Sequence, residues 1–247
     1  MAETTGTVAP FDAPADGLIE LFENGEFEVE GRMPYSSNLT LLVHFTAADD
    51  SDVRAIYKPG QGERPLWDFP DGLYRREVAT YRLSDALGWK VVPPTTLATG
   101  MMGEGSVQAF VNADFSEHYF TLLEAGTAIP DLQKLCVLDF IANNTDRKSG
   151  HCLLGPDGHV YGIDNGLSFH AEFKLRTVIW DFVGDPIPTE LLADVAGLLD
   201  AGPPVELMAL LNPFEQDAML TRARAIVDGR HFPEDDTDGH RWPWPLV

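Results

Sequence analysis

Short runs in which apolar and polar residues alternate dominate the first half of the chain, a period that is typical of half-buried β-strands. The predicted extended segments are residues 27–31, 39–45, 53–58, 91–98 and 106–111. A stretch of good helix formers from Leu73 to Leu87, ended by Gly88, interrupts these strands. A shorter helix is predicted at residues 18–22, before the first strand. This half therefore predicts about five antiparallel strands with one inserted helix.

Helical periodicity replaces strand alternation in the second half. Pro130 opens a helix in which the apolar residues between Leu132 and Ile141 form one broad stripe. Gly-Pro-Asp-Gly at residues 155–158, between two short apolar runs, indicates a β-hairpin. Three further helices are predicted at residues 190–199, 205–211 and 214–227.

Strands followed by helices predict an α+β fold with a seam near residue 112. With 247 residues, 44% of them hydrophobic, the chain can bury a substantial core in one domain or in two lobes. Residues 1–16 are small, polar and proline-containing, and we expect a flexible N-terminal arm there. We expect a β-rich lobe over residues 17–112 and a mainly helical lobe over residues 113–247.

The charge of the chain is unusual for its size. Seventeen Lys and Arg residues stand against 39 Asp and Glu residues, which gives a formal net charge of −22. This field repels phosphate backbones and anionic lipid headgroups, so we predict no nucleic-acid partner and no stable membrane association. The sequence lacks a long apolar span and a basic, apolar leader, and Cys136 and Cys152 lack metal-ligand spacing. We expect a cytoplasmic protein with reduced thiols.

Lys58 stands at the end of an otherwise apolar strand and is followed by Pro59. A charge at such a place is common on edge strands, where it discourages aggregation. It also suits a rigidly held cation that meets nucleotide phosphates. Glu77, on the helix that follows, is a candidate partner that would position Lys58, although a solvated helix residue would look the same in the sequence.

The polar loop at residues 143–151 concentrates a carboxylate, two cations and a histidine in a chain that is poor in cations. An ordinary polar loop, with Asp146 as a cap, is the simple interpretation. The chemical interpretation has Asp146 orient an acceptor hydroxyl or accept its proton, while Arg147 or Lys148 offsets the charge that develops on a phosphate. We call residues 143–151 the candidate catalytic loop.

Asp164 lies in Gly-Ile-Asp-Asn-Gly, directly after the second strand of the hairpin. Asp-Asn-Gly is a common turn sequence, and alone it predicts only a turn. The order along the chain adds more, because a strand lysine, a helix glutamate, a loop aspartate and a strand-end aspartate are the parts that phosphoryl transfer uses. Carboxylate oxygens near a triphosphate suit Mg²⁺.

These motifs also carry a family resemblance. Asn-Thr-Asp146-Arg followed by Ile-Asp164-Asn-Gly resembles the catalytic loop and metal-binding turn of type II phosphatidylinositol 4-kinases, and Tyr-Lys58-Pro resembles their ATP-binding lysine strand. Over most of residues 25–245 the chain is similar to an actinobacterial family of small phosphatidylinositol 3-/4-kinase-like proteins. The resemblance implies a two-lobed, protein-kinase-like fold that binds ATP.

The resemblance also implies roles for single residues. Asp146 is implied as the catalytic aspartate, Asp164 as a metal ligand and Lys58 as a phosphate contact. The implied adenine-side hinge runs from Gln108 to Asn112 and includes Phe110 and Val111, and the implied phosphate loop is Ser36, Ser37 and Asn38. The family usually places a metal-binding asparagine five residues after the catalytic aspartate, and this chain has His151 there.

The resulting hypothesis is an ATP-dependent phosphotransferase in which Asp164 and His151 bind Mg²⁺ or Mn²⁺. Its partners would be ATP and an unidentified phosphoryl acceptor, and a protein or a small molecule fits the acidic chain better than an inositol lipid. Two alternatives use the same residues. One is a pseudokinase that binds nucleotide without turnover, for which His151 is the main argument, and the other is a nucleotidyl transferase.

Overall fold

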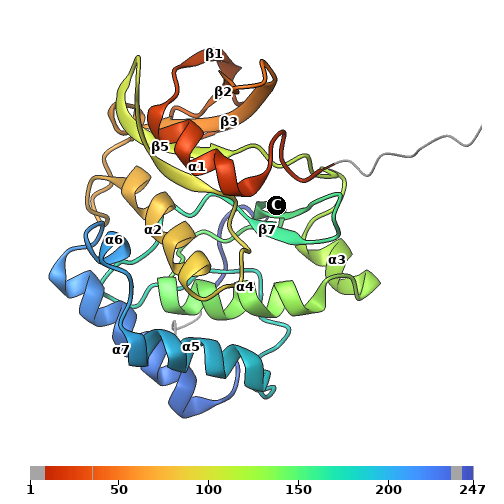
Figure 1. Ribbon diagram of the computed structural model, residues 1–247. Coiled ribbons are helices and arrows are strands. Elements are labelled where there is room, and N and C mark those ends of the chain that lie inside the picture. The colour runs from red at the N-terminus through yellow and green to blue at the C-terminus, as the bar shows by residue number, and fades with distance from the viewer. Residues whose placement is uncertain (1–8, 35, 235–240, 247) are drawn as a thin grey trace, which may run out of the picture.

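A five-stranded sheet carries the first half of the chain (Figure 1). The structure is a computed structural model that describes residues 9–34, 36–234 and 241–246. Its strands are β1 (Phe27–Arg32), β2 (Leu41–Thr46), β3 (Asp52–Pro59), β4 (Thr95–Gly100) and β5 (Gly103–Ala109). The strand order is β1-β2-β3-β5-β4, with every neighbouring pair antiparallel. The five predicted strands are confirmed, although the fourth begins later than expected, after the two prolines.

The two faces of the sheet contact different parts of the molecule, because side chains alternate between the faces along each strand. Tyr57 of β3 is buried in one core with Phe22 of helix α1 (Ala15–Asn24), which crosses that face (Figure 1). Lys58, the next residue, points to the opposite face and reaches helix α2 (Leu73–Ala86). The sheet thus separates an apolar core from a face that carries a charged side chain.

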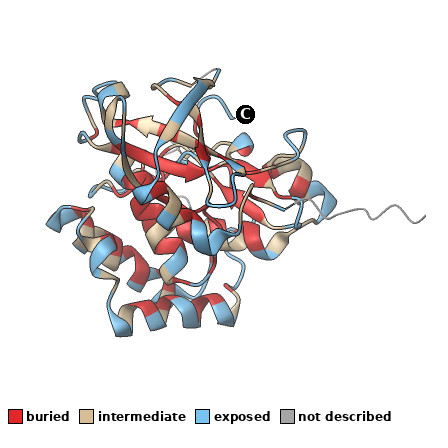
Figure 2. Ribbon diagram, turned by 45° about the horizontal axis from the view of Figure 1, so that its top comes forward, coloured by how far each residue is buried: buried red, intermediate tan, exposed pale blue. Residues whose placement is uncertain are grey.

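Helices are the main regular elements after β5, and the predicted α+β fold is confirmed. They are α3 (Tyr119–Ala125), α4 (Ile129–Ala142), α5 (Thr189–Ala201), α6 (Val205–Met208) and α7 (Pro213–Gly229), and the hairpin strands are β6 (Cys152–Leu154) and β7 (Val160–Gly162). Leu132, Leu135, Leu138 and Ile141 of α4 are fully buried, so the predicted apolar stripe faces the core. Figure 2 shows buried residues gathered where the sheet meets these helices.

An ion pair ties α2 to the C-terminal helix. Arg76 of α2 donates from Nη2 to Glu215 Oε1, and both side chains are almost completely buried. Glu215 also accepts a hydrogen bond from the backbone N–H of Asn212 at 2.9 Å, which caps the start of α7. The guanidinium of Arg76 lies over the ring of Phe69 at 5.3 Å. The helix that carries Glu77 is therefore fixed to the helical half of the molecule.

Residues 9–14 differ from the flexible arm expected over residues 1–16, of which residues 1–8 lie outside the described part. Asp12 forms a two-pronged ion pair with Arg54 of β3, with N–O distances of 2.8 and 2.9 Å. Phe11 contacts the ring of Tyr161 in β7 with 5.3 Å between ring centres. This segment, which we call the N-terminal strap, therefore joins the sheet to the β6–β7 hairpin.

No helix in the described residues is long and apolar enough to cross a membrane. The two cysteines are free thiols, Cys152 buried and Cys136 only half-buried. Burial raises the pKa of the Cys152 thiol to about 12, so this side chain behaves as a small apolar residue.

Candidate active site

Lys58 brings together the sheet, α2 and the turn after β7. Its ammonium forms an ion pair with Glu77, as the order of the motifs predicted. The same Nζ donates to Asp164 Oδ1 at 2.7 Å. Burial disfavours the charged form of Lys58, but the two carboxylates outweigh it and raise its pKa above the usual value. Lys58 is therefore a fixed cation at neutral pH.

Glu77 holds more than the lysine. Its residue surface is only 2% exposed, and its second oxygen, Oε2, accepts a hydrogen bond from the backbone N–H of Asn165 at 2.8 Å. The chain comes so close here that a Cβ on Gly166 would lie 3.3 Å from Glu77 Oε1. One buried carboxylate thus positions both Lys58 and the turn that carries Asp164.

Asp164 leaves β7 in the left-handed backbone region, with φ of 57°, which aspartate tolerates better than most residues. Its side chain is half exposed and faces Lys58 and His151, whose Nε2 lies 3.5 Å from Asp164 Oδ2. The nearby Lys58 ammonium is the main reason that the pKa of Asp164 is well below its usual range. The site therefore presents an ionised carboxylate on its open side, which is suited to a cation.

Asp146 follows α4, which ends in the left-handed residue Asn143. The backbone N–H of Asp146 donates to Asn144 Oδ1 at 2.9 Å, and Lys148 Nζ donates to its carboxylate at 2.8 Å. Burial raises the pKa of Asp146. The loop thus holds a carboxylate with increased proton affinity beside a lysine.

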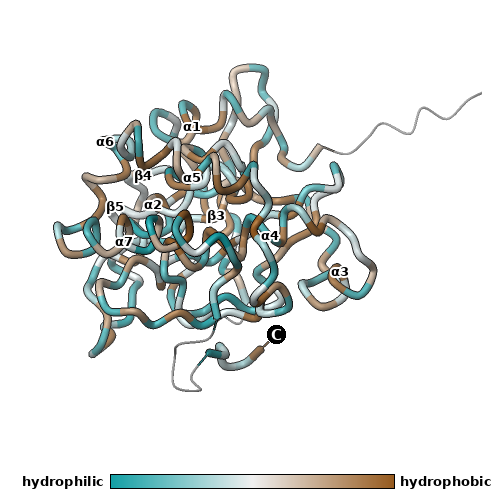
Figure 3. Tube along the Cα trace, turned by 90° about the horizontal axis from the view of Figure 1, so that it is seen from below, coloured by the Kyte–Doolittle hydropathy of each residue, from teal (hydrophilic) through white to brown (hydrophobic). Residues whose placement is uncertain are grey.

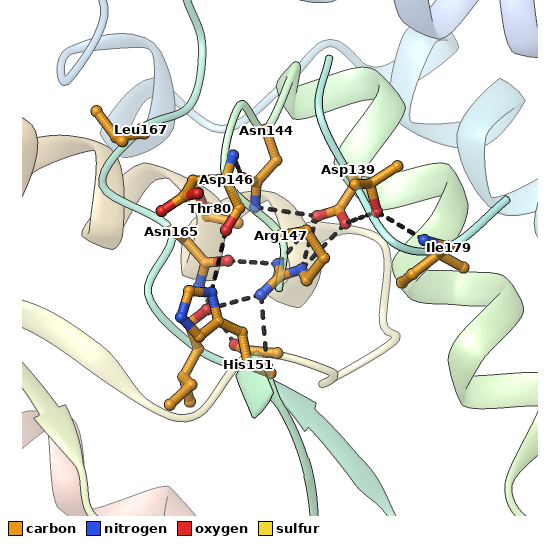
Figure 4. A network of polar contacts seen from close by, with 12 residues as sticks. Thr80, Asp139, Asn144, Asp146, Arg147, His151, Asn165, Leu167 and Ile179 are labelled. Atoms are coloured by element: carbon orange, nitrogen blue, oxygen red, sulfur yellow. Dashed lines mark hydrogen bonds and ion pairs between the residues drawn. The ribbon is translucent and has the colours of Figure 1, made fainter. Parts of the chain in front are cut away.

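Arg147 is not brought to the open side of the site with its neighbours. It is fully buried, and its guanidinium binds both carboxylate oxygens of Asp139 on α4 at 2.9–3.2 Å. It also donates to the backbone oxygen of Ile163 and to Asn165 Oδ1, each at 2.6 Å (Figure 4). Arg147 therefore braces the candidate catalytic loop against the turn of Asp164 instead of facing a phosphate.

His151 links the loop to the turn. Its Nδ1 lies 3.1 Å from the backbone oxygen of Asp146 and 3.4 Å from the backbone nitrogen of Lys148. Burial lowers the pKa of His151 to about 4, so its imidazole is neutral at pH 7.

Among the described residues, no group of three or more His, Cys, Asp or Glu side chains could hold a metal ion. A metal at Asp164 and His151 would need oxygen ligands from a substrate, as Mg²⁺ sites with phosphates do.

Comparison with known proteins shows to which family this chain belongs. The family model for phosphatidylinositol 3- and 4-kinases matches residues 94–214, which include Asp146 and Asp164. Protein Rv2133c of Mycobacterium tuberculosis is 39% identical over 260 residues, which cover 90% of this chain and 92% of that protein. The chain belongs to a family of small bacterial phosphatidylinositol 3-/4-kinase-like proteins. The resemblance noted in the sequence is thereby confirmed.

A more distant relative and two solved structures agree with a kinase-like fold for this family member. Phosphatidylinositol 4-kinase gamma 4 of Oryza sativa subsp. japonica is 29% identical over 155 residues, which are 54% of this chain but 27% of the rice protein. The Golgi casein kinase, in a crystal structure with Mn/ADP bound, matches 94% of this chain and 80% of its own with a TM-score of 0.56 at 15% identity. The structure of hydra Fam20 with sugar matches 87% of both chains with a TM-score of 0.57 at 12% identity. The predicted two-lobed kinase-like fold is confirmed.

The predicted phosphate loop, Ser36 to Asn38, lies between β1 and β2. Asn38 Oδ1 accepts a hydrogen bond from the backbone N–H of Arg64 at 3.0 Å, so this side chain is paired with the loop that follows β3. Ser37 is exposed and Ser36 is half-buried. A role of these residues in phosphate binding stays a prediction.

The predicted hinge begins inside β5. Gln108 is buried and donates from Nε2 to Thr95 Oγ1 at 2.9 Å, while the backbone N–H of Phe110 donates to the backbone oxygen of Arg54 at 3.2 Å. Val111 is buried as well. The side-chain amide of Gln108 is already hydrogen-bonded inside the protein. An adenine base here would therefore bind to backbone groups of the hinge. That contact also stays a prediction.

Sequence reasoning missed three residues that build the site. Asp139 binds Arg147, Asn144 binds the backbone of Asp146, and Asn165 joins Arg147 to Glu77. A signal was present for Asp139, which is a carboxylate within the apolar stripe of a buried helix and therefore requires a buried partner.

Proposed function

We propose that this protein is an ATP-dependent phosphotransferase whose active centre is built from Lys58, Glu77, Asp146 and Asp164. The observation that carries the proposal is the double ion pair of Lys58, because one ammonium connects a sheet strand, α2 and the turn after β7. In kinases, a lysine paired with a helix glutamate and a metal-binding aspartate on the neighbouring turn are needed together for phosphoryl transfer. The kinase-like fold of structural neighbours supports this assignment.

The chemistry follows from the charges. Lys58 would contact the phosphates of ATP, and Glu77 would keep its ammonium in place. Asp146 would accept the proton of the acceptor hydroxyl as the oxygen attacks the γ-phosphorus and the bond to the β,γ-bridging oxygen breaks, releasing ADP. The raised pKa of Asp146 makes its carboxylate a better proton acceptor. Lys148, 2.8 Å from that carboxylate, lies where it would offset charge on the transferred group.

A divalent cation fits the same place. Asp164 offers an ionised, half-exposed carboxylate, and the neutral imidazole of His151 lies beside it. The metal, Mg²⁺ or Mn²⁺, would neutralise phosphate charge in the transition state. An imidazole ligand favours a transition metal over Mg²⁺, and a Golgi casein kinase of similar fold was crystallised with Mn/ADP.

A matched pair of variants tests the function. With ATP labelled on the γ-phosphate, the wild-type protein should release or transfer the label, and Asp146→Asn should slow this by at least about a hundredfold. Asp217→Asn, an exposed change on α7, should retain full turnover. ATP binding without any release of the γ-phosphate would favour the pseudokinase, and transfer of an α-label would favour the nucleotidyl transferase.

The acceptor is proposed to be a hydroxyl on a protein or a small molecule. An inositol headgroup embedded in an anionic membrane is disfavoured because the chain carries a formal net charge of −22.

A further inference from the structure

The last described segment of the chain, residues 241–246, contacts the candidate catalytic loop. The backbone oxygen of Leu246 accepts a hydrogen bond from the backbone N–H of Ser149 at 2.8 Å. Ser149 follows Asp146 by three positions. Figure 3 shows this segment, which we call the C-terminal tail, along the outer edge of the molecule, and Figure 1 shows its end near β7.

The other end of the tail pairs with the segment that flanks the loop. The backbone oxygen of Arg241 accepts hydrogen bonds from the N–H of Thr177 at 3.1 Å and from Trp180 Nε1 at 3.2 Å. Thr177 in turn forms a parallel β-bridge with Arg147 of the loop. The tail is therefore held at both ends by donors that belong to the loop or to its direct neighbour.

Between these ends, one side chain enters the protein. Pro243 is buried, while Trp242, Trp244 and Pro245 are exposed on either side of it. Two of the donors named above, those of Ser149 and Thr177, are backbone N–H groups, which bind the main chain of any extended peptide. Backbone pairing combined with a buried side chain is how proteins recognise extended segments.

A second observation at this place concerns Ser149 itself. Its side chain is completely buried, and its Oγ has no hydrogen-bond partner among the described residues. Burying a polar group in this way costs free energy, which is tolerated mainly where a ligand or water completes the site.

The tail cannot itself be phosphorylated where it lies. Residues 241–247 read Arg-Trp-Pro-Trp-Pro-Leu-Val and contain no Ser, Thr or Tyr. A segment that is bound to the candidate catalytic loop and lacks a hydroxyl has the properties of an unreactive substitute for an acceptor.

We propose that the surface formed by Ser149, Thr177 and Trp180 is the acceptor groove, that the acceptor is an extended polypeptide, and that the C-terminal tail occupies the groove as a pseudosubstrate. The inference rests on the proposed phosphotransferase function and names its substrate class. A serine or threonine at the position of Leu246 would present its hydroxyl to the loop. Its oxygen would form the new bond to the γ-phosphorus, its proton would pass to Asp146, and ADP would leave.

Charge further defines the acceptor. The protein carries a formal net charge of −22, which attracts cationic peptides. In the tail, the guanidinium of Arg241 lies over the rings of Trp180 and Trp242, 5.9 and 5.0 Å from their centres. The preferred peptide would thus contain a basic residue followed by a proline, with the hydroxyl a few positions later.

The first test turns the pseudosubstrate into a substrate. Full-length Leu246→Ser, incubated with γ-labelled ATP and Mn²⁺ or Mg²⁺, should acquire phosphate on residue 246, located by mass spectrometry. The rate should be independent of protein concentration, because the reaction is intramolecular. Val205→Ser places an equally new serine on exposed α6 and should stay unmodified. Leu246→Ser combined with Asp146→Asn should also stay unmodified.

These results separate the groove from the function. If γ-phosphate is released to water or to other residues but the new serine of Leu246→Ser stays unmodified, the acceptor groove is overturned while the phosphotransferase stands. If no γ-phosphate leaves ATP in any variant, the proposed function fails. The proposal that the tail occupies a peptide-binding groove is then tested only by the binding experiment that follows.

The binding test uses the exposed and buried prolines of the tail as a matched pair. Pro243→Asp places a charge in a buried position and should displace the tail, whereas Pro245→Asp places the same charge in solvent and should not. A fluorescent peptide of sequence Arg-Trp-Pro-Trp-Pro-Leu-Val should bind the full-length Pro243→Asp protein roughly tenfold or more tightly than wild type or Pro245→Asp, because a tethered tail competes at high effective concentration.

Circular dichroism would verify that the Pro243→Asp protein is folded. Equal or absent peptide binding to all three proteins would overturn the groove. If Pro243→Asp does not fold, Pro243→Ala replaces it, since this change removes part of the buried ring from the tail and leaves Ser149, Thr177 and Trp180 of the groove intact.

Discussion

At the scale of single residues, Lys58 donates to carboxylates from two different parts of the fold. Lys58→Met should lower ATP affinity by roughly ten- to a hundredfold, the value of a charged hydrogen bond to phosphate. Lys58→Arg keeps the charge and should retain more of the affinity. Calorimetric titration with ATP measures both, and an unchanged affinity of Lys58→Met would remove Lys58 from the nucleotide site.

His151 permits an equally direct test. When its Nδ1 carries the proton and donates to the backbone oxygen of Asp146, its Nε2 lone pair faces Asp164. Wild-type turnover should then prefer Mn²⁺ over Mg²⁺, and His151→Asn should shift the ratio toward Mg²⁺ by roughly tenfold. His231→Asn, an exposed control, should leave the ratio unchanged. The same metal ranking in all three proteins would show that His151 is not a ligand.

The site residues that could be predicted from the sequence are those whose order along the chain matches the order of groups used in phosphoryl transfer. That order predicts that Lys58, Glu77 and Asp164 act together, and the structure joins them through ion pairs. Its position beside Asp146 predicts that Arg147, or Lys148, faces a phosphate. The actual partner of Arg147, Asp139, lies on the preceding helix, and a buried ion pair of this kind depends on packing that no local pattern records.

At the scale of elements, the pair between Arg76 and Glu215 decides how firmly α2 is held. Arg76→Met leaves the Glu215 carboxylate buried without its partner, so the free energy of unfolding should fall by about 3–5 kcal/mol. Arg76→Met combined with Glu215→Gln removes both charges, and an amide at residue 215 can still bond the N–H of Asn212. The double variant should regain much of the loss. Urea denaturation measures both, and equal stability of the two variants would contradict the buried-charge explanation.

Elements were predictable where their boundaries carry strong local signals. The helix ended by Gly88 and the hairpin around residues 155–158 are present as expected. The short helix α3 was missed, and α6 ends at Met208, earlier than its apolar residues suggested. The polar composition of residues 1–16 predicts a flexible arm, but the N-terminal strap is ordered by the ion pair between Asp12 and Arg54, by hydrogen bonds with Asn112 and by packing of Phe11 on Tyr161.

At the scale of the whole molecule, the acidic surface sets what the protein can approach. The formal net charge of −22 predicts that the protein does not sediment with vesicles containing anionic lipid at physiological salt. Vesicles of neutral lipid provide the baseline. Sedimentation with the anionic vesicles above that baseline would restore a membrane lipid as the acceptor.

The N-terminal strap links the sheet to the hairpin, and its stability should depend on pH. Hydrogen bonds from Arg54, opposed by burial, lower the pKa of Asp12 to about 2. A lowered folded-state pKa contributes stability above the unfolded-state pKa of about 4, and this contribution is lost as the pH falls from there toward 2. Asp12→Asn should therefore cost roughly 1–2 kcal/mol at pH 7, after allowance for solvent screening at the partly exposed Arg54.

The difference in unfolding free energy between wild type and Asp12→Asn should narrow between about pH 5 and pH 3, because the wild-type carboxylate then loses its advantage as the unfolded chain takes up protons. Asp217→Asn, exposed on α7, controls for the removal of one negative charge from an acidic protein and should show no such narrowing. Urea denaturation at several pH values measures the three proteins. A difference that stays constant with pH would show that the strap is held by packing of Phe11 on Tyr161 and not by the ion pair.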